Sequence, residues 1–191
     1  MTSDRFAKVI AAIDAANAAD PNLVEDGGER VPAALLYGQR MSLQLLWFVP
    51  DASEHLRIAA RGQHIERWRV PRADFPEGRA GYLAWRREAA RFHARRVGEI
   101  MGACGYDAAD CARVGRLLRK EGLREDPEVQ ALEDVACLVF LRHYLTDFAK
   151  GRDPAQLRRI VARTARKMSP AARTAAAGLD LPEGLAGALG A

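Results

Sequence analysis

Apolar residues recur at intervals of three and four along most of this chain, which is the spacing of one face of an α-helix. The clearest case is the stretch 126–141, in which every residue from Val135 to Leu141 is apolar. Asp126 followed by Pro127 is typical of a helix start, because Asp caps free amide groups and Pro fits the first turn. Since a helix without a polar face must be covered by its neighbours, we expect this helix at the centre of the protein.

Seven further segments have the same spacing, and a Pro, a Gly or a capping residue bounds each of them. The predicted helices follow Ser3 as far as Asp20, run from Pro32 to Pro50, from Asp51 or Ser53 to Arg67, from Tyr82 to Gly105 and from Asp107 to Gly122, and begin again at Pro154 and Pro170. Residues 25–29 read as a polar loop and residues 70–78 as irregular, and no stretch alternates with the period of a half-buried strand. We therefore predict an all-α fold, a single-domain bundle of about seven to eight helices over residues 1–178 with a C-terminal tail, 179–191.

The composition indicates where the protein is located and what charge its ligand carries. The 191 residues are 49% hydrophobic, and 29 basic against 25 acidic residues leave a net charge of +4. A mild positive excess of this kind suits an anionic ligand. The three cysteines have no paired spacing, and no apolar run is long enough to be a signal core or a membrane span. We expect a cytoplasmic protein with reduced cysteines that does not act on membranes; the sequence does not give its oligomeric state.

Several polar residues fall at positions that face inward on the predicted helices. They are Gln39, Gln63, His64, His93, Glu133 and Asp134. Asp134, for example, shares a helix face with Leu138 and Leu141. A buried carboxylate needs a cation, a metal or strong donors, so these residues are expected either to meet in one polar site or to form separate hydrogen-bonded pairs.

Arginines and aromatic residues alternate around the irregular segment. They are Arg61, Arg67, Arg69, Arg72, Arg79, Arg86 and Arg87, interleaved with Trp68, Tyr82 and Trp85. Guanidinium groups bind phosphate in a bidentate manner, and an indole ring can stack on a base. The alternative is a solvated, Arg-rich helix surface with the aromatic rings in the core. Lys120 lies near a predicted helix end, where a cation also favours the helix dipole.

Six segments resemble a known family. They are Tyr37–Ser42, Ala59–Trp68, Pro71–Arg72, Arg79–Arg86, Phe92–Ala94 and Leu132–Leu141. In these segments, and over roughly Phe6 to Met168, the chain resembles the domain of unknown function family 4202, which has no assigned activity. More distantly, the order of helices is similar to the HD superfamily of metal-dependent phosphohydrolases, with ligands in the pattern H…HD…D. In this comparison Gln39 replaces the first His, Gln63-His64 replaces His-Asp, and Asp134 matches the last aspartate.

The HD resemblance implies an enzyme acting on a phosphorylated small molecule or nucleotide. His64, His93, Glu133 and Asp134 would then be catalytic, and His64, His93 and Asp134 would hold a divalent metal such as Mn, Mg, Zn or Fe. Substrate would contact Gln39, Arg40, Arg61, Gln63, Arg67, Trp68, Arg72, Arg79, Tyr82, Arg86 and Lys120. Because amide oxygens are weak, neutral ligands, the alternative is a non-catalytic HD-like module that binds a nucleotide or RNA through the Arg- and Trp-rich surface.

Overall fold

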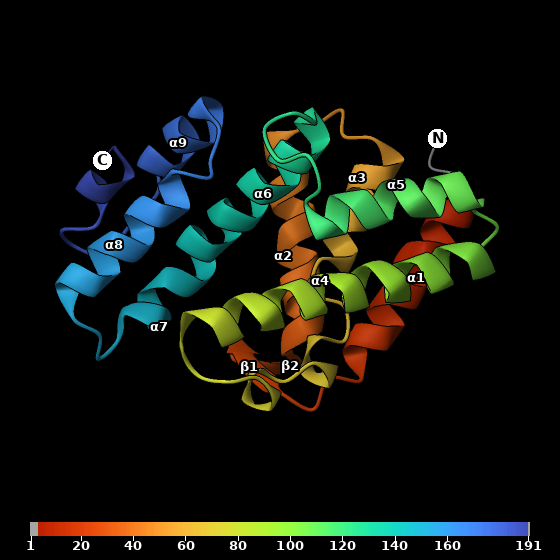
Figure 1. The fold of residues 1–191 in the computed structure, drawn as a ribbon, viewed down its shortest axis with the longest axis horizontal. Coiled ribbons are helices and arrows are strands. Elements are labelled where there is room, and N and C mark those ends of the chain that lie inside the picture. The colour runs from red at the N-terminus through yellow and green to blue at the C-terminus, as the bar shows by residue number, and fades with distance from the viewer. Residues whose placement is uncertain (1–3, 191) are drawn as a thin grey trace. The chain divides into compact units, whose positions relative to one another are not determined.

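Nine α-helices and one short β-hairpin form most of the regular structure of residues 4–190, the part of the chain that the computed structural model describes (Figure 1). The predicted all-α fold is therefore confirmed. Contacts between residues divide the chain into two units, Met1–Gly122 and Leu123–Ala191, which we call unit 1 and unit 2 and describe separately. The single domain over residues 1–178, with residues 179–191 as its tail, stays a prediction.

Unit 1 is built around α3. Its elements are α1 (Asp4–Ala18), β1 (Leu23–Asp26), β2 (Glu29–Pro32), α2 (Ala33–Phe48), α3 (Glu54–Gly62), α4 (Gly78–Ala103) and α5 (Ala108–Arg119), with 3-10 turns at Arg67–Arg69 and Arg72–Asp74. The short helix α3 contacts α1, α2, α4 and α5, and its Leu56, Ile58 and Ala59 are buried. Helices α4 and α5 run side by side in Figure 1. The core of unit 1 therefore surrounds α3, whose end leads into Gln63 and His64.

Two glycines let neighbouring helices approach this end of α3 closely. A Cβ atom on Gly38 of α2 would lie 2.8 Å from the backbone oxygen of Arg61. A Cβ atom on Gly62 of α3 would lie 2.5 Å from a methyl group of Val97 in α4. Because neither distance leaves room for a side chain, glycine at both positions brings α2 and α4 against the same end of α3.

The hairpin β1–β2 corrects the expectation of a polar loop at residues 25–29. The strands are antiparallel, and Asp26 pairs with Glu29 across a two-residue turn of Gly27 and Gly28. Both glycines have positive φ, 60° and 88°, which a two-residue hairpin turn requires and glycine adopts readily. These residues lack an alternating pattern because β1 is exposed along its whole length and β2 has no buried residue. The Gly-Gly pair was the available signal.

The predicted helix starts agree well with the structure. The side chains of Ser53, Asp107, Asp126, Asp153 and Ser169 each accept a hydrogen bond from a backbone N–H in the first turn of α3, α5, α6, α8 and α9. Two starts differ from the prediction. Pro32 ends β2, so α2 begins at Ala33, and α4 begins at Gly78, four residues before Tyr82.

Unit 2 contains the apolar helix that the sequence placed at the centre of the protein. Its elements are α6 (Pro127–Val139), a π-helical turn (Phe140–Tyr144), α7 (Leu145–Ala149), α8 (Pro154–Ala165), α9 (Pro170–Ala177) and a 3-10 turn, Ala186–Leu189. The π-helical turn begins inside the stretch 126–141 that the sequence predicted as one helix, and it separates α6 from α7. Within unit 2, α6 contacts α9, and the last 3-10 turn contacts α8 and α9. In the described part of the chain, no helix is long and apolar enough to cross a membrane.

Candidate functional site

Two histidines and a tyrosine form the centre of a polar cluster in unit 1. His64 follows the end of α3, and its ring stacks on Tyr37 of α2, with ring centroids 3.9 Å apart and planes inclined by 16°. The ring of His93, from the middle of α4, lies 5.9 Å from that of His64 between centroids. The close approach at Gly38 and Gly62 therefore brings together three helices that each contribute one ring.

The hydrogen bond of His93 fixes which of its nitrogens carries the proton. His93 Nδ1 lies 2.8 Å from the backbone oxygen of Ile65, and a carbonyl oxygen can only accept, so Nδ1 is the donor. Burial and, next, the charge of Arg67 lower the pKa of His93 to about 3. The ring is therefore neutral at pH 7, and Nε2 presents a lone pair. Nε2 is buried and has no hydrogen-bond partner among residues 4–190.

Positive charges surround His64. Burial is the largest cause that lowers the pKa of His64 well below its usual value, and the charges of Arg67, Lys120 and Arg86 act in the same direction. His64 is thus a neutral ring in a positive field. In the described part of the chain, no carboxylate forms an ion pair with Arg67 or Arg86. These two guanidinium groups, without a paired carboxylate in the described chain, favour an anion at the same place.

The aromatic rings of α4 position these arginines. The guanidinium carbon of Arg67 lies 4.6 Å from the ring centroid of Trp85, and Trp85 Nε1 donates to the backbone oxygen of Val70 at 2.8 Å. The guanidinium carbon of Arg86 lies 6.0 Å from the ring centroid of Tyr82. Because an aromatic ring attracts the cation without supplying an oxygen acceptor, the N–H groups of both guanidinium groups remain available to one.

Glu66 holds the turn that carries His64 and Arg67. Its φ of 46° is in the left-handed region, which is costly for a residue with a side chain. Two contacts compensate for this. Its backbone N–H donates to the side-chain oxygen of Asn17 at 2.9 Å, and its buried carboxylate accepts from Arg96 Nε at 2.8 Å. The turn after α3 is therefore fixed from α1 and from α4.

Several residues that the sequence placed in the site have structural partners instead. Arg61 makes a bidentate ion pair with Asp14, both bonds 2.6 Å long, and Arg72 donates to the backbone oxygens of Phe75 and Pro76. These two guanidinium groups therefore already bind protein oxygens, although the sequence predicted them as substrate contacts. Arg40 forms an ion pair with Asp26.

The remaining predicted contacts differ in exposure. Gln39, expected to face inward, is exposed, and Gln63 is buried as expected. Arg79, Tyr82 and Arg86 are exposed, whereas Trp68 and Lys120 are half-buried. Among the predicted substrate contacts, Gln63, Arg67, Arg86 and Lys120 are those that lie beside His64 in sequence or act on its pKa.

The acidic pair of α6 has its own partners within unit 2. Asp134 Oδ1 accepts from Gln130 Nε2 at 2.9 Å and from the backbone N–H of Ser169 at 2.8 Å. Glu133, also buried, forms an ion pair with Lys167 at 3.4 Å. Asp134 therefore anchors the residue that caps α9, a structural role that the helical spacing did not predict.

The residues were tested for their fit to the divalent metal that the HD resemblance implies. Within residues 4–190, no three His, Cys, Asp or Glu side chains come together as a set of metal ligands. The imidazoles of His64 and His93 lie in a field of positive charge, which opposes a further cation. The donor set of unit 1 does not fit the metal. The assignment of His64, His93 and Asp134 as metal ligands stays a prediction.

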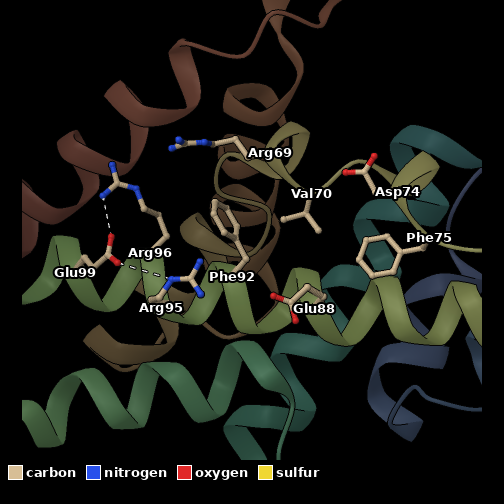
Figure 2. A pocket seen from close by; sticks show the side chains of 9 residues that line it. All are labelled: Arg69, Val70, Asp74, Phe75, Glu88, Phe92, Arg95, Arg96 and Glu99. Atoms are coloured by element: carbon tan, nitrogen blue, oxygen red, sulfur yellow. Dashed lines mark hydrogen bonds and ion pairs between the residues drawn. The ribbon is translucent and has the colours of Figure 1, made fainter.

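A separate open pocket lies between α4 and the turns that precede it, with a volume of about 780 Å³. Figure 2 shows Phe92 near its middle and, at one end, Glu99 paired with Arg95 and Arg96. Its three arginines and three carboxylates give no net charge. None of the predicted site residues lines it, so we do not place the candidate site there.

Tyr37 is the main residue of the cluster for which the sequence predicted no role. It lies on the same face of α2 as the buried Met41, one turn away. A tyrosine on an inward row, next to a glycine, is a signal for an aromatic ring with a polar end that faces a partner. His64, its partner, was predicted as a site residue, but the stack between them depends on the approach of α2 to α3.

The fold and this cluster define an all-α protein with neutral imidazoles in a positive field. A family model described as "Domain of unknown function (DUF4202)" matches residues 7–188. The match covers most of the chain, so the protein belongs to the DUF4202 family, as the resemblance implied. A search of curated proteins and a search of solved structures returned no match. The relationship to the HD superfamily stays a prediction.

Proposed function

We propose that unit 1 binds a phosphorylated small molecule, with a nucleotide as the expected class, through Arg67 and Arg86 next to the stacked His64 and Tyr37. The observation that carries this proposal is the local charge. Arg67 and Arg86 lower the pKa of His64 and form no ion pair with a described carboxylate. A phosphate group would supply a negative charge, and its oxygen acceptors would replace the water molecules that otherwise bind these guanidinium groups.

The neighbouring rings support a ligand with a planar or apolar part. Tyr37, His64 and Trp85 lie around Arg67 in unit 1. Burial is the largest cause that lowers the pKa of Arg67, so its charge is already partly removed from water. An anion that binds there meets a cation with little competing hydration, which strengthens the attraction.

Isothermal titration with inorganic phosphate and with AMP tests the proposal. Replacing Arg86 with Gln should weaken both by about tenfold or more, because a hydrogen bond to a charged group contributes about 1.5–3 kcal/mol. Arg87→Gln is the matched control. Arg87 is the next residue of α4, also exposed, and its charge does not act on His64.

Arg67→Gln should weaken binding at least as strongly as Arg86→Gln. Added salt should weaken binding of both ligands to the wild type, because screening reduces the attraction between charges. Equal loss in the Arg86 and Arg87 variants, or binding that ignores salt, would show that the arginines next to His64 hold no phosphate.

Phosphohydrolase activity remains our prediction from the HD resemblance. It is tested by incubating the protein with AMP and other phosphate esters, with Mn²⁺, Mg²⁺ or Zn²⁺ added, and measuring released phosphate. Turnover that requires a metal and is lost in Asp134→Ala would favour the enzyme. Binding without turnover would favour the non-catalytic module, for which RNA is a further ligand to titrate.

A further inference from the structure

Two buried acceptor atoms have no partner: one belongs to the residue that precedes His64, and the other to the histidine ring beside it. His93 Nε2 and Gln63 Oε1 are both buried and form no hydrogen bond within the described chain, and the two side chains are only 3% and 9% exposed. An unsatisfied polar atom in a protein interior is costly, and such atoms are rare in folded proteins. Two of them around one turn therefore require an explanation.

Both atoms belong to the group of residues around His64. Gln63 directly precedes His64, and His93 binds the backbone oxygen of Ile65, which directly follows it. That bond occupies Nδ1 and leaves Nε2, at the other nitrogen position of the ring, as the free acceptor. The imidazole of His93 also lies beside that of His64. No neighbouring side chain donates to either atom, so each can accept a hydrogen bond from an O–H or N–H group of a ligand.

We propose that the phosphate-binding site of unit 1 also recognises a hydrogen-bond donor on its ligand, a hydroxyl or an amino group, through His93 Nε2 and Gln63 Oε1. This inference rests on the proposed function, because it takes the arginines to bind the phosphate of the same ligand. The ligand is then a phosphate ester that carries at least one O–H or N–H group. A simple anion would satisfy only half of the site.

Binding of four probes tests this inference. Methyl phosphate at about pH 8 has no donor, because the second ionisation of such an ester is complete well above about pH 6. Ribose 5-phosphate adds hydroxyl groups, 2′,3′-dideoxyadenosine 5′-phosphate adds an amino group without ribose hydroxyls, and AMP has both. We expect AMP to bind about tenfold or more tightly than methyl phosphate, and the two intermediate probes distinguish a hydroxyl from an amino donor.

Gln63→Met removes the acceptor at nearly constant volume. We expect it to weaken AMP binding by about tenfold, leave methyl phosphate binding unchanged, and equal or raise the melting temperature of the free protein, because an unpaired buried polar group is lost. Gln44→Met is the matched control. Gln44 is buried in α2 with an unpaired Nε2 and lies about 10 Å along the helix from Tyr37. Gln44→Met should change stability in the same direction without affecting AMP binding.

His93→Asn is the second variant, since the Asn amide can still donate to the Ile65 oxygen while Nε2 is lost. It too should reduce the preference for AMP over methyl phosphate. If Gln63→Met and His93→Asn leave this preference unchanged while Arg67→Gln weakens all probes, the further inference fails and the proposed function stands. If the preference depends on Gln63 and His93 but no probe responds to Arg67→Gln or Arg86→Gln, the donor site stands and the proposed phosphate contact fails. If no probe binds, both are overturned.

Discussion

Replacing Gly38 with Ala tests the close approach of α2 and α3 that forms the site. The new Cβ would lie 2.8 Å from the backbone oxygen of Arg61, against at least 3.4 Å for ordinary contact, so the two helices must separate by about 0.6 Å. Overpacking of this kind costs about 1–3 kcal/mol, while Ala in place of Gly in a helix returns about 1 kcal/mol. We expect a net loss of stability of up to about 2 kcal/mol.

Gly98→Ala is the control for helix propensity. Gly98 lies within α4, and a Cβ there would meet nothing within 4 Å. The same substitution should therefore stabilise the protein by about 0.5–1 kcal/mol. The two variants should differ by about 2 kcal/mol, which for a chain of this length is a difference of about 4–8 °C in melting temperature.

Thermal melts and urea titrations followed by circular dichroism would measure this difference. Because Tyr37 precedes Gly38, separation of the helices should also disturb the stack on His64 and weaken phosphate binding. If Gly38→Ala melts at or above Gly98→Ala, with phosphate binding intact, the close approach of α2 to α3 is wrong, and with it the geometry of the site.

Three further predictions concern individual side chains. Arg61→Lys cannot reproduce the bidentate pair with Asp14 and should lower the free energy of unfolding by about 1–3 kcal/mol in urea titrations, with little change in phosphate affinity. Because the pKa of His93 falls from 6.5 to about 3 on folding, the unfolded chain binds the proton first, and stability should fall by about 1.4 kcal/mol per pH unit as the pH drops from 6.5 towards 3; His93→Asn should reduce this slope. Asp134→Ala leaves the backbone N–H of Ser169 without its acceptor and should cost about 2–3 kcal/mol in the same titrations, whereas Asp134→Asn, which keeps an oxygen, should cost less.

Each of these has a clear contrary result. An Arg61→Lys variant with wild-type stability and weaker phosphate binding would show that Arg61 contacts the phosphate, as the sequence predicted. An unchanged pH slope in His93→Asn would mean that His93 titrates normally in the folded protein. If Asp134→Ala were as stable as Asp134→Asn, this carboxylate would have no structural role in unit 2.

The sequence predicted the helices well because their signals are local. An Asp or Ser cap, such as Asp126 or Ser169, acts on amide groups two or three residues away, so the relevant partners are in view along the chain. The π-helical turn at Phe140–Tyr144 has no comparable local signal in this sequence. The hairpin was missed for a different reason: its strands bury no face, so the alternation that identifies a strand was absent.

The roles of the arginines could not be read from the sequence. Arg61 and Arg67 have the same chemistry and lie six residues apart, yet one pairs with Asp14 of α1 and the other stacks on Trp85 of α4. The partner of Arg61 lies 47 positions earlier in the chain, and the partner of Arg67 lies 18 positions later. Charge patterning therefore indicates a region that suits an anion, and only tertiary contacts decide which guanidinium groups are free to bind it.

Tertiary contacts also distinguish the residues around His64 from the acidic pair of α6. Asp134 looks like a ligand by residue type, but its oxygen already accepts two hydrogen bonds from groups of unit 2. Gln63 was predicted only as a substrate contact, yet its oxygen is buried and unmatched, as is Nε2 of His93. Folded proteins satisfy their buried polar groups, and departures from this rule concentrate where a ligand completes the site. The unmatched acceptors of Gln63 and His93 belong to the same part of unit 1 as the guanidinium groups of Arg67 and Arg86, so this turn, rather than the acidic helix, is where we expect a ligand to bind.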